Sequence, residues 1–591
     1  VRLSDYSRMK VISYLTDHFL EIIPKGNAEL HSLGLFLGKN IQFIPNDTGR
    51  RIVPDQIYGF MKKNAVFERV FGRGIGENFE LLDEPLQMLI LEHIDTHIEF
   101  GVGLADSLGE RFMELDDNNR KRILKKTYHG MLFARYFGQS VGRLYGKMPN
   151  ELRSVVMSHT EKNSQFADGL GMGLGYIYAT LERTLQDEIM HKAQKSYDLS
   201  RGLGFGFGLT FTLLQEHDAK NMVSKADNNS ELDVGFGMGL AVTYSNLPDE
   251  LRKFVLDRVA TDCEFAFGAG VYGAYFYKEA CPKDLFLLLH SNGELAYGLG
   301  FGFGATFFYL PEQFRSELEL LIKSNVKLDD GLGSGIGFVL KHLPTEVQER
   351  FIGKASASNA FATGLGYGLG YTWQYIGDAL RQRALAFANS NNDFARGLGV
   401  GLGSHLPYLK STFFEQVISF ADTNSEFDRG FGVGVVWAWP YHTDDAKRTI
   451  IERMKTRGEF ARGLGFGLAR IVQHFPANER EQMLDRLAWD PMFSEGFGEG
   501  TAQFLWTVYG EANKHQFLKL TINSPEISKG LGIGLGFTYL YSKNELSHES
   551  YKHVFKKDPN FRRGLGTGMG RAYKYLSEDA QLEALRMSEE D

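Results

Sequence analysis

Bulky apolar residues and glycines alternate in short runs that recur at a regular interval along the chain. Residues 394–403 read FARGLGVGLG, and close copies occur at residues 166–175, 361–370 and 561–570. Self-similarity at a fixed period of about 20 to 50 residues is typical of repeat proteins. We therefore predict one continuous array of repeats, in place of the several domains that a chain of 591 residues would otherwise suggest.

The first glycine of each run gives the period. Successive first glycines lie 33 residues apart, except for one step of 30 and two of 34. They are Gly169, Gly202, Gly235, Gly268, Gly298, Gly331, Gly364, Gly397, Gly430, Gly463, Gly496, Gly530 and Gly564. Degenerate copies lie upstream at irregular spacing, at Ser32, Val70, Glu99 and Tyr136. We expect about 17 repeats: irregular ones over residues 1–160, regular ones over 161–576, and a C-terminal capping helix over 577–591.

Two helices are predicted for each repeat. Asp490, Ser524 and Asp558 each precede a proline shortly before a glycine run, and a capping residue followed by proline marks a helix start. In other repeats the cap position holds Asp262, Asn292, Asn391 and Asn424. About 19 residues later a recurring proline ends this first helix, and a shorter amphipathic helix follows. Glycine at alternate positions would also fit a β-strand, but the caps and the four-residue apolar spacing favour an all-α fold.

The four glycines of a first helix occupy two opposite flanks. At about 100° per residue, the first and third glycines share one flank, and the second and fourth share the other. Each interior glycine costs about 0.5–1 kcal/mol relative to alanine, and close approach of neighbouring backbones would offset this cost. First helices should then lie closer together than second helices, which pack at about 8–10 Å. The pattern predicts a strongly curved α-solenoid, a superhelix or a ring, with the glycine-rich first helices on its concave wall.

Several repeats carry a Leu-Gly-x-x-Tyr element, as LGYIY at residues 174–178, LGFTY at 535–539 and, in a Met variant, MGRAY at 569–573. With the 33-residue period and the paired helices, this element resembles tetratricopeptide-type repeats, and the architecture is similar to that of HEAT repeats. The chain departs from the tetratricopeptide pattern because its second helices lack the expected small residues and its proline lies between the two helices. The resemblance covers nearly the whole chain and implies a scaffold that binds partners.

Composition and charge exclude several classes of protein. The chain has 67 glycines but only 15 prolines, with 43% hydrophobic residues, so it is neither collagen-like nor disordered. A net charge of −8 gives no global attraction to nucleic acid or to anionic membrane. No apolar run reaches the roughly 20 residues of a membrane-spanning helix, and residues 1–6 lack an apolar signal core. Cys263 and Cys281 lie at opposite ends of one predicted helix, too far apart for a disulfide, so we expect free thiols and a cytoplasmic, reducing location.

One position in each repeat lies on the wall that faces away from the second helix. This central slot comes three residues after the first glycine, and ten of its thirteen residues in the regular repeats are apolar or aromatic. A contiguous exposed apolar patch usually marks a binding surface. The slot residues expected to bind a partner are Met172, Phe205, Met238, Phe301, Tyr367, Phe466 and Ile533. The other interpretation is that tight curvature buries this row against itself.

A charged row, called the pre-glycine row, lies one residue before the first glycines. Its Arg396, Arg429 and Arg462 are candidate partner-binding residues. Beside aromatic rings they would also suit a single-stranded nucleic acid, whose bases stack on the rings while arginines contact the phosphates. Acidic residues three positions earlier, such as Asp393 and Glu459, favour local ion pairs that neutralise the row.

Side-chain clusters that could carry chemistry are sparse. His93 and His97 have the i,i+4 spacing of a metal pair, but no third ligand accompanies them, so the pair is a weak candidate and we expect no cofactor. No Ser, Cys or His arrangement has the form of a nucleophile with its base, so we expect no enzyme. The predicted function is a scaffold or adaptor that binds a partner protein or peptide on a concave apolar surface. The alternatives are single-stranded nucleic-acid binding and self-assembly of a structural protein.

Overall fold

The computed structural model describes most of the chain. The described residues are 5–23, 26–44, 52–94, 97–128, 130–275, 288, 292–323, 325–472, 477–485, 490–504, 524–538, 558–573 and 581–582.

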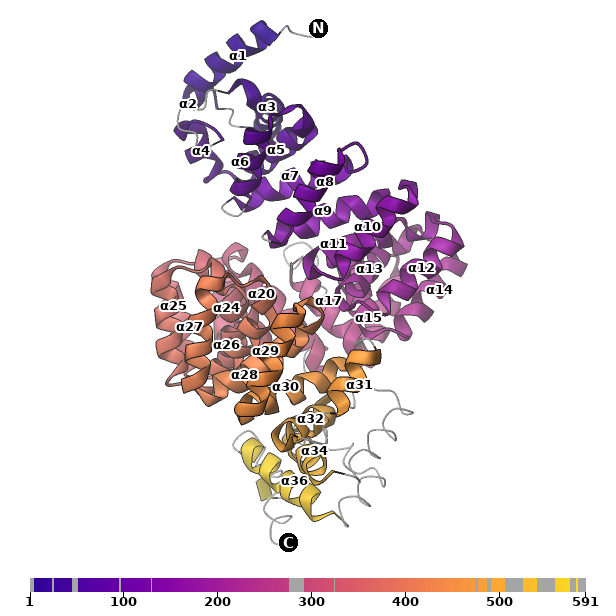
Figure 1. Cartoon of the computed structure of the whole chain (residues 1–591), viewed down its shortest axis with the longest axis vertical. Coiled ribbons are helices and arrows are strands. Elements are labelled where there is room, and N and C mark those ends of the chain that lie inside the picture. Colours follow the sequence, from indigo (N-terminus) through magenta and orange to yellow (C-terminus); the bar gives the residue numbers. More distant parts are fainter. Residues whose placement is uncertain are drawn as a thin grey trace. The chain divides into compact units, whose positions relative to one another are not determined.

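Every regular element among these residues is a helix, and none is a strand. The first helix of each repeat contains the glycines and is called the glycine helix below; a 3₁₀ turn and a second helix usually follow it (Figure 1). The prediction of an all-α solenoid is therefore confirmed, and the strand alternative is wrong for the described part of the chain.

The helices have the following bounds. The glycine helices are α3 (Asn27–Lys39), α5 (Ala65–Glu77), α7 (Ile98–Glu110), α9 (Met131–Leu144), α11 (Ser164–Ile177), α13 (Tyr197–Thr210), α15 (Ser230–Thr243), α17 (Cys263–Tyr275), α20 (Gly293–Thr306), α22 (Val326–Val339), α24 (Asn359–Tyr371), α26 (Asn392–His405), α28 (Ser425–Trp437), α30 (Gly458–Ile471), α32 (Pro491–Phe504), α34 (Pro525–Thr538) and α36 (Pro559–Ala572). The second helices are α4 (Asp55–Met61), α6 (Glu84–His93), α8 (Asp117–Lys126), α10 (Asn150–Thr160), α12 (Arg183–Ala193), α14 (Glu216–Asp227), α16 (Asp249–Thr261), α21 (Glu312–Leu321), α23 (Thr345–Ala355), α25 (Asp378–Ala388), α27 (Ser411–Thr423), α29 (Asp444–Thr456) and α31 (Ala477–Asp485). Helices α1 (Asp5–Asp17) and α2 (Phe19–Ile22) precede them.

Capping side chains fix where the glycine helices begin. Asn391 accepts a hydrogen bond from the backbone N–H of Phe394, and Asn424 accepts one from Phe427. Asp558, which precedes Pro559, caps α36 in the same way. An Asn, Ser or Asp in this position satisfies N–H groups that have no partner inside the helix. The start sites expected from the sequence are confirmed.

The glycine helices end earlier than the sequence pattern indicates. Helix α11 stops at Ile177, and Tyr178 opens a 3₁₀ turn, η4 (Tyr178–Thr180), by donating its N–H to the carbonyl of Gly175. The equivalent Trp373, in η10 (Trp373–Tyr375), is fully buried. The tighter 3₁₀ winding lets the large aromatic side chain fold under the end of the helix and into the core. The other 3₁₀ turns are η1 (Ile41–Phe43), η2 (Phe79–Leu81), η3 (Tyr145–Lys147), η5 (Phe211–Leu213), η6 (Tyr244–Asn246), η8 (Phe307–Tyr309), η9 (Leu340–His342), η11 (Leu406–Tyr408) and η12 (Trp439–Tyr441).

The core lies between the glycine helices and the second helices. In α26 the stripe of Phe394, Leu398 and Leu402 has no exposed surface. Phe394 meets Phe387 of α25 edge to face, with ring centroids 5.0 Å apart. Burying such side chains supplies about 1.5–3 kcal/mol each, which helps to offset the glycines of the same helix.

Consecutive glycine helices pack directly against one another from α3 to α15 and from α17 to α36. The chain forms two compact units, residues 1–240 and 241–591, called unit 1 and unit 2. Within each unit the helix pairs follow one another as consecutive repeats (Figure 1).

The glycines are the points at which neighbouring backbones touch. A Cβ atom placed on Gly169 would lie 1.9 Å from the carbonyl oxygen of Arg135 in α9, and one on Gly171 would lie 2.3 Å from that of Leu199 in α13. The first and third glycines of a run face the preceding helix, and the second and fourth face the following one. Any side chain at these positions would force the helices apart.

Some expectations concern residues outside this description. The predicted capping helix over 577–591 lies outside the described residues, apart from Gln581 and Leu582, and so does Cys281. Cys263 is a free thiol whose pKa is raised to about 11, mainly by burial. Within the described ranges, no helix combines the length and the apolar character needed to cross a bilayer.

Candidate partner-binding surface

The central-slot residues differ in exposure from repeat to repeat. In unit 1, Met172 and Phe205 are each only 7% exposed, while Met238 is half-buried. In unit 2, the side chains of Phe301, Tyr367, Val400 and Phe466 are half-buried and reach solvent. Ile533 of α34 is buried. Ser334 of α22 and Val433 of α28 are also buried. The slot is therefore an internal packing position in many repeats and reaches solvent in α20, α24, α26 and α30.

Two of the accessible slot residues of unit 2, Phe301 and Tyr367, belong to a row of touching aromatic rings. Phe301 of α20 meets Phe338 of α22 with centroids 5.5 Å apart, and Phe338 meets Tyr367 of α24 at 6.2 Å. Tyr371, one turn further along α24, lies 6.3 Å from Tyr367. All four side chains are half-buried. The aromatic faces thus form one connected, partly solvent-exposed strip across three glycine helices.

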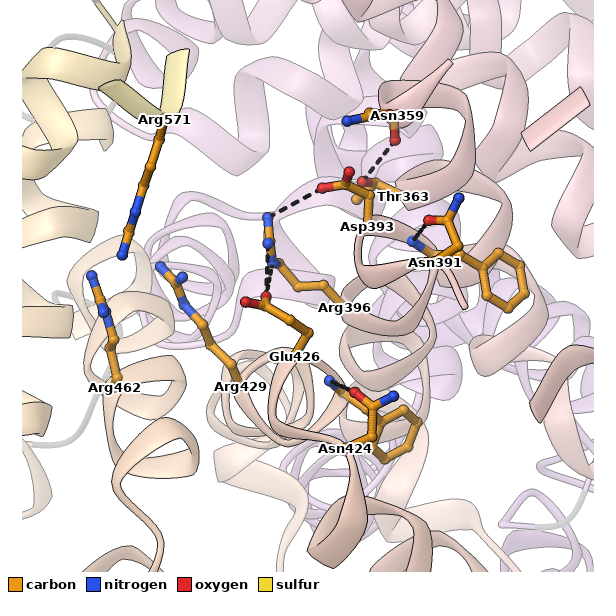
Figure 2. Close-up of polar contacts among 12 residues, drawn as sticks. Asn359, Thr363, Asn391, Asp393, Arg396, Asn424, Glu426, Arg429, Arg462 and Arg571 are labelled. Atoms are coloured by element: carbon orange, nitrogen blue, oxygen red, sulfur yellow. Dashed lines mark hydrogen bonds and ion pairs between the residues drawn. The ribbon is translucent and has the colours of Figure 1, made fainter. Parts of the chain in front are cut away.

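The pre-glycine arginines are paired with acids from other repeats. Arg396 contacts Glu426 of the next glycine helix at 2.7 Å and, more loosely, Asp393 at 3.6 Å (Figure 2). Arg429 and Arg462 are 9% and 6% exposed. Their ion-pair partner is Glu499, at 2.6 and 3.0 Å. The i,i+3 pairing that the sequence favours is present at Arg396, whereas the buried arginines pair over longer distances.

Glu499 is the centre of this ion-pair network. It occupies the central slot of α32, and its partner Arg429 lies 70 residues earlier, in α28. Arg571 of α36 approaches the same carboxylate from the other side, at 3.8 Å. Burial acts to raise the pKa of Glu499, but Arg429 and Arg462 outweigh it and hold that pKa below its ordinary value. Side chains of α28 and α32 thus meet past the intervening helix α30.

Three arginine side chains converge on the Glu499 carboxylate. Figure 2 shows Arg429, Arg462 and Arg571 pointing toward one another from α28, α30 and α36. Burial and the neighbouring Arg462 lower the pKa of the Arg571 guanidinium. Arg462 also pairs with Glu495 at 3.1 Å, and Lys529 pairs with the same glutamate at 2.6 Å. The network has no local sequence signal, because its members are separated by one or more repeats.

Sequence reasoning also missed a polar group on α20 and α22. Asp330 stands in the pre-glycine row of α22, half-buried, and burial raises the pKa of its carboxyl to about 7. Tyr297 holds the same position in α20, and its hydroxyl lies 3.4 Å from the hydroxyl of Ser334. A single Asp between glycine runs carries no pattern that distinguishes it from an ordinary surface residue.

The histidine pair is occupied by other contacts. The Nδ1 atom of His97 lies 2.8 Å from a carboxylate oxygen of Glu68, and that of His93 lies 2.9 Å from the carbonyl of Leu89. The two rings are stacked with centroids 6.2 Å apart. Across the part of the chain that is described, no three His, Cys, Asp or Glu side chains are grouped as a metal site requires.

Comparison of the chain with protein-family models, with curated proteins and with solved structures finds no significant match. The helical-repeat architecture is compatible with a scaffold or adaptor, and any closer statement about function rests on the surface itself.

Proposed function

We propose that this chain is a non-enzymatic repeat scaffold of the cytoplasm that holds a partner protein or peptide on unit 2. The binding surface, called the inner face below, comprises the slot residues Phe301, Tyr367, Val400 and Phe466 with Phe338 between them. The observation that carries the proposal is the connected strip of half-buried aromatic rings over α20, α22 and α24.

Partly exposed aromatic residues are the usual anchors of protein interfaces. They bury a large area with few rotatable bonds, and their truncation commonly removes most of the binding energy. The rings of the inner face are fixed by contacts with each other and stand on rigid helices, so little conformational entropy is lost when a partner covers them. A repeat array presents such a strip over a long distance, which suits an extended segment.

The ion pairs of the pre-glycine row favour a protein partner over a nucleic acid. Arg429 and Arg462 are buried and already bonded to Glu499. A phosphate backbone would have to displace that carboxylate before it reached either guanidinium. The alternative of single-stranded nucleic-acid binding therefore has fewer free arginines than the sequence indicates.

The proposal is tested by capture from a lysate of the source organism. The triple variant Phe301→Ser, Tyr367→Ser, Phe466→Ser removes three slot side chains of the inner face. We expect it to lose the proteins that the wild-type chain retains, as measured by quantitative mass spectrometry. The matched control is Phe308→Ser, Tyr309→Ser, which removes two aromatic side chains that are 55% and 75% exposed in η8.

Equal loss of captured proteins in the control, or full retention in the triple variant, would place binding elsewhere. Circular dichroism on all three proteins separates loss of binding from loss of fold. Light scattering across a range of concentrations distinguishes a partner from a second copy of the chain, because self-assembly raises the scattering mass without any added protein.

A further inference from the structure

Three of the four acidic residues in the pre-glycine row and the central slot, Asp168, Glu495 and Glu499, are paired with basic residues. In unit 2, Glu495 pairs with two basic side chains and Glu499 with three. In unit 1, Asp168 binds Arg135 at 2.7 Å and Arg201 at 3.2 Å. Because the array repeats, these pairs define what an acid in this row normally contacts.

The arginines around Asp168 come from the repeats on either side. Arg135 holds the pre-glycine position in α9, and Arg201 holds it in α13. An acid in the row is thus neutralised by its two neighbours in the same row.

Asp330 is in the same row but lacks these partners. Its neighbours in the row are Tyr297 in α20 and Thr363 in α24, neither of which carries a charge. Among the described residues, no group makes a hydrogen bond or an ion pair with its carboxylate. The basic side chain with the largest effect on it, Lys327, is bonded to Glu294 at 2.8 Å.

The surroundings of Asp330 are aromatic and partly open. Tyr297 lies within electrostatic reach of Asp330 and of Tyr367, and all three residues are half-buried. Burial raises the pKa of Asp330 to about 7; Lys327 opposes this, and Glu294 and Asp329 add to it. The positive charge of Arg470 acts to lower the pKa of Tyr297 and that of Glu294. The carboxylate is therefore costly to ionise unless a positive charge arrives.

We propose that Asp330, Tyr297 and Tyr367 form a subsite on the inner face that receives an arginine or lysine side chain of the partner. This inference rests on the proposed function, and it adds the chemistry of the partner: an extended segment with a basic residue among apolar ones. The partner's cation takes the place that Arg135 and Arg201 fill beside Asp168.

Two physical effects favour such a ligand. The incoming charge pairs with a half-buried carboxylate, where the pair is screened less than at an open surface. Tyrosine faces also attract a cation placed over them, and the planar guanidinium stacks well on such rings. Uptake of the cation lowers the pKa of Asp330 toward its ordinary range, so binding should strengthen as the pH rises through about 7.

A ligand-free measurement tests the geometry first. Thr363→Arg puts an arginine at the position equivalent to Arg201, and Thr363→Gln is the uncharged control of similar length. We expect Thr363→Arg to unfold at a higher urea concentration than Thr363→Gln at pH 8.5, and at the same concentration at pH 4.5, where Asp330 is protonated. If the two variants unfold at the same urea concentration at pH 8.5 as well as at pH 4.5, Asp330 does not lie beside position 363.

The binding test uses labelled nonapeptides of Gly, Ser, Leu and Phe with arginine, lysine or the uncharged analogue citrulline at the centre. Affinities are measured by fluorescence anisotropy at pH 8. We expect the arginine and lysine peptides to bind wild type at least tenfold more tightly than the citrulline peptide. Asp330→Asn and Thr363→Arg should remove that difference, whereas Thr363→Gln and Glu312→Gln, an exposed acid on α21, should keep it.

The proposal is overturned if the basic peptides show no advantage, or if Asp330→Asn leaves the advantage intact. Its failure differs from a failure of the proposed function. Peptides that bind irrespective of charge, with a loss in Phe466→Ser, would leave the scaffold function standing without the subsite. If no peptide binds while lysate proteins are still lost in the triple variant, the subsite is likewise rejected.

Discussion

A single missing atom, the Cβ of glycine, sets the distance between consecutive helices. A Cβ on Gly397 would lie 1.9 Å from the carbonyl oxygen of Thr363 and 2.8 Å from its carbonyl carbon. Both are backbone atoms, which cannot rotate away as a side chain can. The glycines therefore act through direct backbone contact, although each one weakens its own helix.

The contact predicts opposite results for two glycine substitutions. Gly397→Ala should destabilise the protein by about 3 kcal/mol, because the added methyl group separates α26 from α24. Gly353→Ala in α23 should stabilise it by about 0.5–1 kcal/mol, since a Cβ there meets no atom within 4 Å. Urea unfolding followed by circular dichroism measures both, and a similar shift for the two variants would show that the glycines are not contact points.

Helices and their caps were predictable from the sequence, whereas the 3₁₀ turns were not. Asn391 and Asp558 carry their own signal, because a capping side chain acts on a backbone N–H only a few residues away. The early end of α11 depends on where the Tyr178 ring finds space in the core. Other helices form that space, so the sequence pattern of one helix does not predict where the helix ends.

At the scale of contacts between helices, we predict that a single substitution in the Glu499 network lowers stability and speeds hydrogen exchange. Glu499→Gln removes the carboxylate charge that pairs with the buried Arg429 and leaves Arg462 with Glu495 as its remaining acid. Breaking a buried pair in this way costs about 3–5 kcal/mol. Hydrogen exchange should become faster in α28, α30 and α32. Glu415→Gln, which changes an exposed acid on α27, should leave the exchange of these helices unaltered.

Unchanged exchange in Glu499→Gln would mean that the arginines find other acceptors. Replacing Glu499, Arg429 and Arg462 by methionine should recover much of the stability, because the buried Glu495 keeps Lys529 and only the partly exposed Arg571 loses its partner. The network was beyond sequence reasoning, since Arg429 and Glu499 are 70 residues apart and meet only after the helices have packed.

At the scale of the whole molecule, the same position of the repeat is buried in some repeats and accessible to solvent in others. The 33-residue period and the all-α array were predictable because every repeat carries the same glycine signal. The sequence left open whether the central slot is an exposed surface or is buried against itself, and the structure shows both: Met172 and Ile533 are buried, whereas Phe301 and Tyr367 reach solvent. Burial at a slot depends on side chains that neighbouring repeats contribute, and the residue at the slot does not by itself specify them.

The central claim is that a partner lies on the inner face of unit 2, and site-specific photo-crosslinking tests it most directly. A photoreactive phenylalanine analogue is placed at Val400, a half-buried slot residue of α26, or at Leu320, which is 83% exposed on the second helix α21. After irradiation in lysate, we predict a covalent adduct with a captured protein from position 400 and none from position 320. An adduct from position 320 alone, or the same adduct from both, would contradict the proposal.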